Sequence, residues 1–198
     1  MKKFTVILDA GHGEETPGKR SPVLEDGRQL LEWKFNREVC AVIKQLLDEE
    51  GIKCILANED NVDYKLSERA SVINIICDNE REFGSTPIMI SVHGNAALNG
   101  NDWVNVTGWE VYSTPGETNS DKLAECFCEV FSSVFPDKKL RGHKEEDFTV
   151  IVKTNCPCVL TENFFYDGKS DCELMLSDEG KMNIARLHVE AIKKYMTL

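Results

Sequence analysis

Short apolar runs alternate along the chain with longer segments in which apolar residues recur every three or four positions. The apolar runs predict strands at residues 3–9, 52–57, 87–92, 109–113, 148–152 and 158–161. The helical spacing of apolar positions predicts helices at residues 29–50, 67–79, 121–135 and 178–195. Because strands alternate with helices, we expect an α/β fold with a mainly parallel sheet.

Local signals support the first elements of this prediction. Gly51 follows the helix of residues 29–50 at the position where glycine commonly ends helices, and the strand 52–57 begins directly after it. The resulting β-α-β unit favours a parallel pair of strands. Ser67 is a suitable N-cap for the next helix. The sequence contains no linker and no internal repeat, so we expect residues 1–198 to form a single domain.

A long polar segment follows the first predicted strand. Residues 10–27 contain four glycines and two prolines, which predicts a loop. Loops of this length inside a compact domain are usually functional. We therefore expect residues 10–27 to line a site.

Three ionisable side chains stand where predicted strands end. His12 follows the strand 3–9, His93 follows the strand 87–92, and Glu162 follows the strand 158–161. In open parallel sheets, ligands bind in the crevice beyond the carboxyl ends of the strands. Two imidazoles and one carboxylate form the ligand set of many catalytic zinc sites, which leave one position for water. The sequence therefore predicts a zinc site at this edge, with His12 and His93 as ligands.

Four glutamates are candidates for the carboxylate ligand: Glu14, Glu15, Glu25 and Glu32. Glu14 and Glu15 lie so near His12 in sequence that the chain would have to double back to bind the same ion. Glu32 lies in the first turn of a predicted helix, which favours it, and Glu25 on the loop is the alternative. Glu162 then remains as an acid–base group.

Each of these signals also has a plainer structural explanation. His12 between two glycines fits a turn, His93 after a buried strand fits a core histidine, and Glu162 fits a cap. Asp9 is either a carboxylate that orients a ligating histidine or a cap at the end of a strand. We expect His143 in a solvated loop and His188 on the face of a helix.

Charge and hydropathy limit the choice of partners. The 198 residues carry a formal net charge of −11, which argues against nucleic acid or an anionic membrane as the partner. No apolar run approaches the roughly 20 residues of a membrane span, so membrane insertion is not expected. The first residues, MKKFTVILDAGHG, do not have the pattern of a signal peptide, so we expect synthesis in the cytoplasm.

Eight cysteines are many for a chain of this length. They include two Cys-x-Cys pairs, Cys126 with Cys128 and Cys156 with Cys158, for which a soft-metal site is one interpretation. Free cysteine is also a small residue that is often buried, and a reducing compartment requires no further explanation for it. We expect buried free thiols.

The motifs of the chain occur in the order of a known family. The sequence contains ILDAGHG, LLEWKFN, LSERASVIN, MISVHGNA, GWEVY and VLTENFF, which together extend over nearly all of the chain. In these motifs it resembles the zinc-dependent N-acetylmuramoyl-L-alanine amidases of the Amidase_3 type. Arg69 and Glu110 also match family positions, and we expect them in ion pairs of the scaffold. Ala10 replaces the usual proline, and Phe164 and Gly168 replace a more common glycine and asparagine.

The resemblance implies a single catalytic amidase domain with a six-stranded twisted sheet flanked by helices, of the phosphorylase/hydrolase-like type. It places zinc on His12, Glu32 and His93, with Glu162 as the catalytic residue. The implied reaction is hydrolysis of the amide between N-acetylmuramic acid and L-alanine of the stem peptide. Peptidoglycan is then the partner, and we expect a monomer that acts at the cell wall or in the periplasm as an autolysin or endolysin.

Two other functions are compatible with the same cleft. One is a zinc-dependent peptidase that acts within the stem peptide. The other is a catalytically dead module that binds the cell wall. Only the first of these would release a product, and neither would free the whole stem peptide from the glycan.

Overall fold

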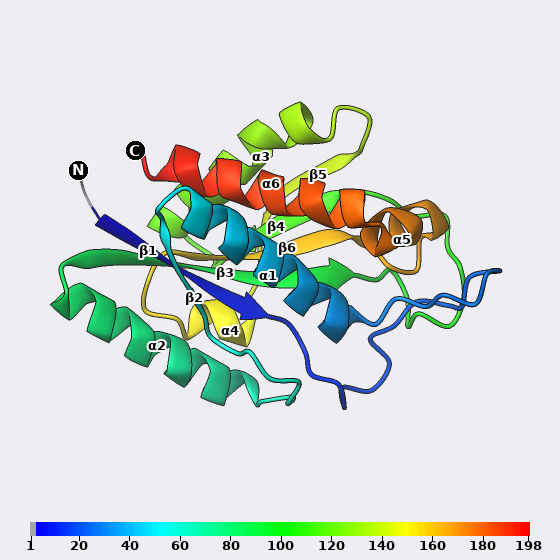
Figure 1. Cartoon of the computed structure of the whole chain (residues 1–198), viewed down its shortest axis with the longest axis horizontal. Helices are drawn as coiled ribbons and strands as arrows, with labels where there is room; N and C mark the ends of the chain where they lie inside the picture. Colours follow the sequence, from blue (N-terminus) through cyan, green and yellow to red (C-terminus); the bar gives the residue numbers. More distant parts are fainter. Residues whose placement is uncertain (1–2) are drawn as a thin grey trace.

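A six-stranded sheet with helices on both faces forms the centre of the computed structural model, which describes residues 3–198 (Figure 1). The strands are β1 (Lys3–Ala10), β2 (Lys53–Leu56), β3 (Ser85–Asn95), β4 (Trp109–Ser113), β5 (Leu140–Glu145) and β6 (Cys158–Phe165). Their order in the sheet is β2-β1-β3-β6-β4-β5, and only β6 and β4 pair antiparallel. The predicted α/β fold with a mainly parallel, six-stranded sheet is confirmed.

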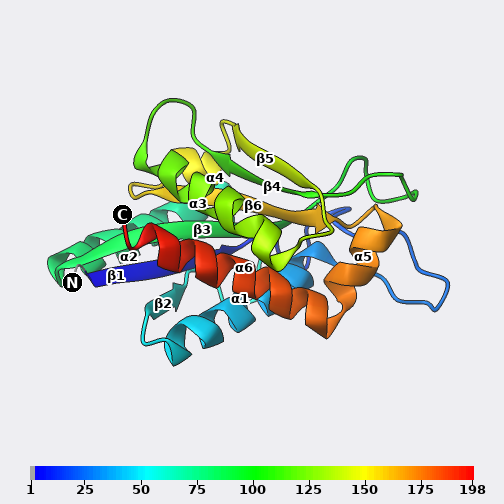
Figure 2. The same ribbon diagram turned by 90° about the horizontal axis from the view of Figure 1, so that it is seen from above.

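Helices cover the two faces of the sheet unequally. The helices are α1 (Glu32–Glu49), α2 (Leu66–Glu82), α3 (Asn119–Val134), α4 (Thr149–Val152), α5 (Lys169–Leu176) and α6 (Asp178–Tyr195). On one face α6 lies between α1 and α3 and packs against both (Figure 2). The long helix α2 and the four-residue helix α4 pack on the other face. This second face is the less thickly covered one.

Alternate residues of the central strands pack into two separate apolar cores, one on each face of the sheet. Val6 and Ile90 belong to the core under α1, α3 and α6, whereas Ile7 and Met89 belong to the core under α2 and α4. Successive side chains of a strand point to opposite faces, so odd-numbered residues of β1 and β3 face α2 and α4. Asp9 on β1 and Ser91 and His93 on β3 are odd-numbered, so they point to the less covered face.

The strand predicted at residues 148–152 is wrong, because Thr149–Val152 form the helix α4. The sequence TVIV is β-branched and apolar, which is typical of a strand, but a run this short has no readable periodicity. Val150 and Ile151 are buried against the sheet face that α2 also covers. The need to cover that face decides the local structure.

Two elements have no counterpart in the sequence prediction, β5 and α5. The sequence of β5, LRGHKE, is polar and charged, and the strand lies at the edge of the sheet next to β4. Charged residues, lysine above all, are typical of edge strands because they discourage pairing with other chains. The strand exists through its pairing with β4, which local sequence does not reveal.

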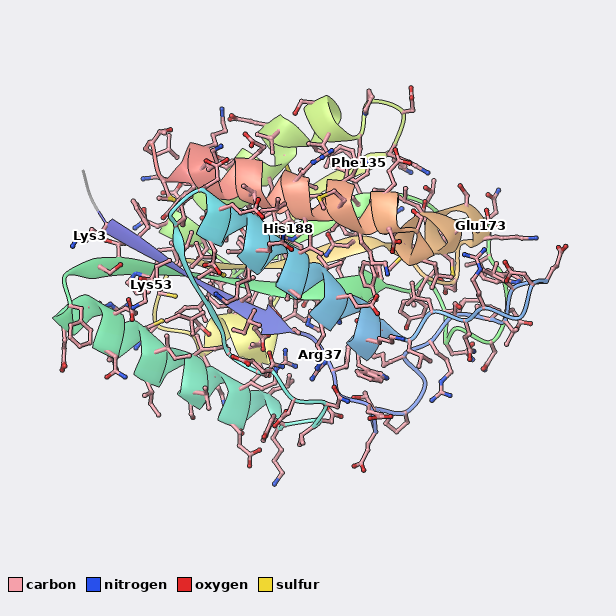
Figure 3. The ribbon with its side chains drawn as sticks, viewed as in Figure 1. Lys3, Arg37, Lys53, Phe135, Glu173 and His188 are labelled. Carbon is pink, nitrogen blue, oxygen red and sulfur yellow. The ribbon has the colours of Figure 1, made fainter. Side chains whose placement is uncertain are left out.

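Three local predictions are corrected by the structure. The helix α2 begins at Leu66 with Lys65 as its N-cap, so Ser67 is not the cap. His143 lies on β5 instead of in a solvated loop, and its Nε2 is 2.7 Å from the hydroxyl of Ser113. The third correction concerns His188, which is fully buried on α6 rather than on an exposed helix face (Figure 3).

The burial of His188 sets its protonation. Its Nδ1 donates to the carbonyl of Ile184 at 2.8 Å, and its Nε2 accepts from the hydroxyl of Thr161 at 3.0 Å. Burial lowers the pKa of His188 to about 4, so the ring is neutral at pH 7. This histidine is a satisfied core residue under the strand that carries Glu162.

Candidate metal centre

A tight turn at the end of β1 presents His12. The N–H of Gly11 donates to the carbonyl of Val92 at 2.9 Å, which holds the turn against β3. His12 has a φ of 60°, in the left-handed region that few residues other than glycine adopt. A Cβ atom at Gly11 would overlap the ring of His93, so Gly11 is needed for space beside that ring.

Glu32 is the first residue of α1 and is only 1% exposed. Its Oε1 lies 3.2 Å from Nε2 of His12 and 3.2 Å from Nδ1 of His93. Burial disfavours the charged form of this carboxylate, but hydrogen bonds to the two histidines outweigh burial and lower its pKa. The helix thus brings a carboxylate over the strand ends to two imidazoles from β1 and β3. Glu25 is excluded from this group, because its side chain is exposed and pairs with Lys169.

The helix α1 also holds the histidine turn in place. One turn beyond Glu32, the side-chain amide of Asn36 donates to the carbonyl of Gly11 at 3.0 Å. The guanidinium of Arg37 donates to the carbonyl of His12 at 2.8 Å. Asn36 is fully buried and belongs to the LLEWKFN motif, but only the fold shows that it fixes one metal-ligand candidate relative to another.

The three side chains lie close enough together that they could hold a metal ion. One ligand atom from each of His12, Glu32 and His93 lies within 4.8 Å of the other two. Among residues 3–198, this is the one group of three or more such side chains that satisfies this criterion. The Oε2 atom of Glu32 is buried without a hydrogen-bond partner and forms only a long ion pair of 3.8 Å with Nζ of Lys19, so a closer ligand would satisfy it. Burial lowers the pKa of His93, which keeps its ring neutral and its lone pair available.

Glu162 lies next to this group on β6. It pairs in register with His93 on β3 and with Glu110 on β4, so the three residues form a row across the sheet. Its Oε2 is buried and has no hydrogen-bond partner. Burial, followed by the negative charges of Glu32 and Glu110, raises its pKa well above the ordinary value, and the charge of Lys19 opposes this. A carboxylate with a raised pKa is suited to accept and return a proton near neutral pH.

Asp9 does not contact His12 in the described structure. It forms a buried ion pair with Arg69 of α2 and accepts a hydrogen bond from the hydroxyl of Ser91 at 2.6 Å. The same hydroxyl oxygen lies 3.2 Å from Nε2 of His93. Asp9 therefore reaches the other histidine, through Ser91, rather than the turn that follows it. Ser91 was missed in the sequence analysis, although it stands two residues before His93 on the same strand face.

Comparison with known proteins bears directly on this geometry. The family described as N-acetylmuramoyl-L-alanine amidase, Amidase_3, matches residues 6–194. The chain belongs to this family. The match includes every residue of the candidate site, so the prediction of a peptidoglycan amidase is confirmed at the level of the family.

Two relatives of this Amidase_3 chain are named as an endolysin and as an amidase. It is 26% identical over 200 residues to an endolysin of Bacillus phage SPP1, with 98% of this chain and 66% of the endolysin covered. It is 27% identical over 199 residues to the N-acetylmuramoyl-L-alanine amidase CwlM of Bacillus licheniformis, with 98% and 69% covered. The chain thus spans about two thirds of the length of each of these relatives.

A solved amidase has the same fold as this Amidase_3 chain. The N-acetylmuramoyl-L-alanine amidase of Clostridium difficile 630 superposes with a TM-score of 0.82 at 23% sequence identity. The superposition covers 100% of this chain and 98% of that one. The two chains therefore share the whole architecture, including the sheet edge on which the candidate site lies.

Beside Glu162, the Amidase_3 chain carries an ion-pair network whose partners on β5 only the fold reveals. Glu110 is 3% exposed, and its Oε2 accepts from Arg141 at 2.7 Å and from Lys144 at 2.6 Å, both on β5. Its Oε1 accepts from Asn95 at 2.7 Å. The expectation that Glu110 forms an ion pair of the scaffold is confirmed. The two cations keep this buried carboxylate ionised, so it stays a negative neighbour of Glu162.

Proposed function

We propose that residues 1–198 form a single catalytic domain that hydrolyses the amide bond between N-acetylmuramic acid and L-alanine of the stem peptide in peptidoglycan. The proposed metal ligands are His12, Glu32 and His93, and Glu162 is the proposed catalytic residue. The observation that carries this proposal is the meeting of two imidazoles and a buried carboxylate, beside a second carboxylate whose Oε2 is buried without a hydrogen-bond partner. The family match supports the choice of bond.

Zinc is the metal that this donor set fits. Two neutral imidazole nitrogens and one carboxylate oxygen are the protein ligands of many catalytic zinc sites. The lowered pKa values of His93 and Glu32 keep both ligands in the form that binds a cation. Members of the Amidase_3 family are generally zinc-dependent, and the buried Oε2 of Glu32 makes no hydrogen bond that a metal ion would have to displace.

In the proposed mechanism, three of the four side chains hold the metal and the fourth, Glu162, transfers a proton. Zinc bound there would lower the pKa of a water molecule to about 7 and polarise the substrate carbonyl. Glu162 accepts the proton of the attacking water and passes it to the nitrogen of the leaving L-alanine. Glu110, held by its two cations, remains a negative neighbour that favours the protonated form of Glu162 between these steps.

The proposed place of action is the cell wall, where relatives such as the probable cell wall amidase LytH of Staphylococcus epidermidis are named to act. Across the residues that the structure describes, no helix combines the length and the apolar character needed to cross a bilayer. A monomer is proposed, because the four site residues all come from one chain.

A muropeptide digest tests the proposed bond. Purified peptidoglycan treated with the zinc-loaded protein should release peptides that begin with L-alanine and leave the glycan chains intact. Mass spectrometry of the soluble products distinguishes this from cleavage within the stem peptide, which would leave L-alanine attached to muramic acid. Zinc binding without any released product would support a dead cell-wall-binding module and contradict the proposal.

Replacement of Ser91 tests the proposed orientation of His93. We expect Ser91→Ala to weaken zinc binding about 10–100-fold, because the ligating ring loses the partner that connects it to Asp9. Competition with a chromophoric chelator measures the affinity. The matched control is Ser113→Ala, which removes another buried strand hydroxyl that bonds Asp121 and lies outside the site. Equal zinc affinity of the two variants would contradict a role for Ser91.

A further inference from the structure

Two of the eight cysteines lie in neighbouring segments of one buried cluster. Cys77 on α2 and Cys156, two residues before β6, both belong to the apolar cluster between the sheet and α2, and their chain neighbours Asp78 and Asn155 are hydrogen-bonded. Cys77 is fully buried and Cys156 is 8% exposed. All eight cysteines fall within residues 3–198 and are free thiols there. The prediction of buried free thiols is confirmed for seven cysteines, and Cys128 is half-buried.

The segments that carry these two thiols are fastened to each other by polar contacts. The amide of Asn74 donates to the carbonyl of Lys153 at 2.8 Å, and the N–H of Asn155 donates to the side chain of Asn74 at 2.8 Å. The amide of Asn155 also donates to Asp78 at 3.1 Å and accepts from Arg81 at 3.1 Å. The residues of α2 in these contacts lie before and after Cys77, and their partners lie directly before Cys156. The backbone segments that carry Cys77 and Cys156 are thus held beside each other.

The surroundings of the pair favour thiol chemistry. The Cys156 thiol donates to the Cys77 sulfur and lowers the pKa of Cys77; burial opposes this and the charge of Arg81 adds to it. A cavity of about 490 Å³ is lined by Cys156 and by its neighbours on both sides, from Thr154 to Cys158. A small reagent can therefore approach the pair from the side of Cys156. The neighbouring Cys77 and burial raise the pKa of the Cys156 thiol, so Cys77 is the more readily ionised of the two sulfurs.

We propose that Cys77 and Cys156 form a disulfide when the protein meets a low-molecular-weight disulfide oxidant. Each thiol gives up its proton, the two sulfurs form one bond, and the two electrons reduce the oxidant to two thiols. The new bond joins α2 to the segment that enters β6 and closes a loop of roughly 80 residues, which restricts the unfolded chain. Cys158 begins β6 at the end of the strand away from His93 and Glu162, so the bond leaves the candidate metal centre unchanged.

Thiol counting and cross-link mapping test this disulfide in the wild-type protein. After incubation with oxidised glutathione and denaturation, six titratable thiols should remain of the eight in the chain. Peptide mapping without reductant should show Cys77 joined to Cys156. The thermal unfolding midpoint should rise by about 5–10 °C and return to its starting value with dithiothreitol. Muropeptide release should be the same in both forms.

Matched variants separate this pair from the other cysteines. Cys156→Ala should keep its remaining seven thiols free of internal cross-links and show no rise of the midpoint, and its zinc content reports that it is folded. Cys128→Ala, which removes the half-buried cysteine of α3, should lose two thiols as the wild type does. Eight remaining thiols in the wild type, a cross-link between other cysteines, or a stable glutathione adduct at Cys156 would each overturn the proposal.

Discussion

Glu162→Gln is expected to keep zinc and to lose about a thousandfold or more in the rate of muropeptide release. The amide has the size of the carboxylate but cannot take a proton from water and pass it to an amine. Glu162 makes no hydrogen bond through Oε2, so the substitution breaks no contact of that atom. The fold and the three proposed ligands should remain, because their mutual hydrogen bonds do not involve Glu162. Release of peptides beginning with L-alanine is measured beside zinc content.

The control for this substitution is Glu173→Gln on α5. Glu173 is exposed, and its side chain extends outward from the helix (Figure 3). This variant removes the same charge from the surface and should retain wild-type turnover. If Glu162→Gln also turns over at the wild-type rate, the proposed catalytic role of Glu162 is wrong. If it loses zinc together with activity, Glu162 acts on the metal site instead.

His93→Ala is expected to lose both zinc and activity. The substitution removes one of three proposed ligands and leaves the buried Glu32 with a single histidine partner. A bound ligand stabilises the native state, by about 4 kcal/mol at a free concentration 1,000 times its dissociation constant. A chelator should therefore lower the unfolding midpoint of the wild type by several degrees and leave that of His93→Ala unchanged. Differential scanning calorimetry with and without the chelator, together with metal analysis, measures both effects.

His143→Ala is the matched control for this second prediction. His143 is a half-buried histidine on β5 that bonds Ser113 and does not belong to the metal group. This variant should bind one zinc per chain and respond to the chelator as the wild type does. Full zinc occupancy in His93→Ala would contradict the ligand assignment. Loss of zinc in both variants would show that metal content reports on general stability rather than on ligation.

Local sequence was sufficient for the elements with strong periodicity. The long amphipathic helices and the apolar central strands were predicted close to their observed positions, because burial of one helix stripe or of both strand faces imposes a regular apolar pattern. The predictions failed where the pattern is short or where pairing decides. Residues 149–152 are apolar and β-branched yet helical, and β5 is a polar edge strand that depends on β4. The prediction also failed for His188, because the local sequence does not show whether a polar side chain on a helix is buried.

The sequence by itself determined the α/β fold class, the family resemblance and the two strand-end histidines, since strand periodicity and the carboxyl-end rule depend on local pattern alone. Helix placement favoured Glu32 among four glutamates, and only the tertiary structure brought its carboxylate within 3.2 Å of both rings. The contacts of Asp9 through Ser91 and the placement of Cys77 and Cys156 in one buried cluster were likewise decided by the fold. These contacts join segments far apart in the chain, and their distances follow from strand order and helix packing, which no local pattern encodes.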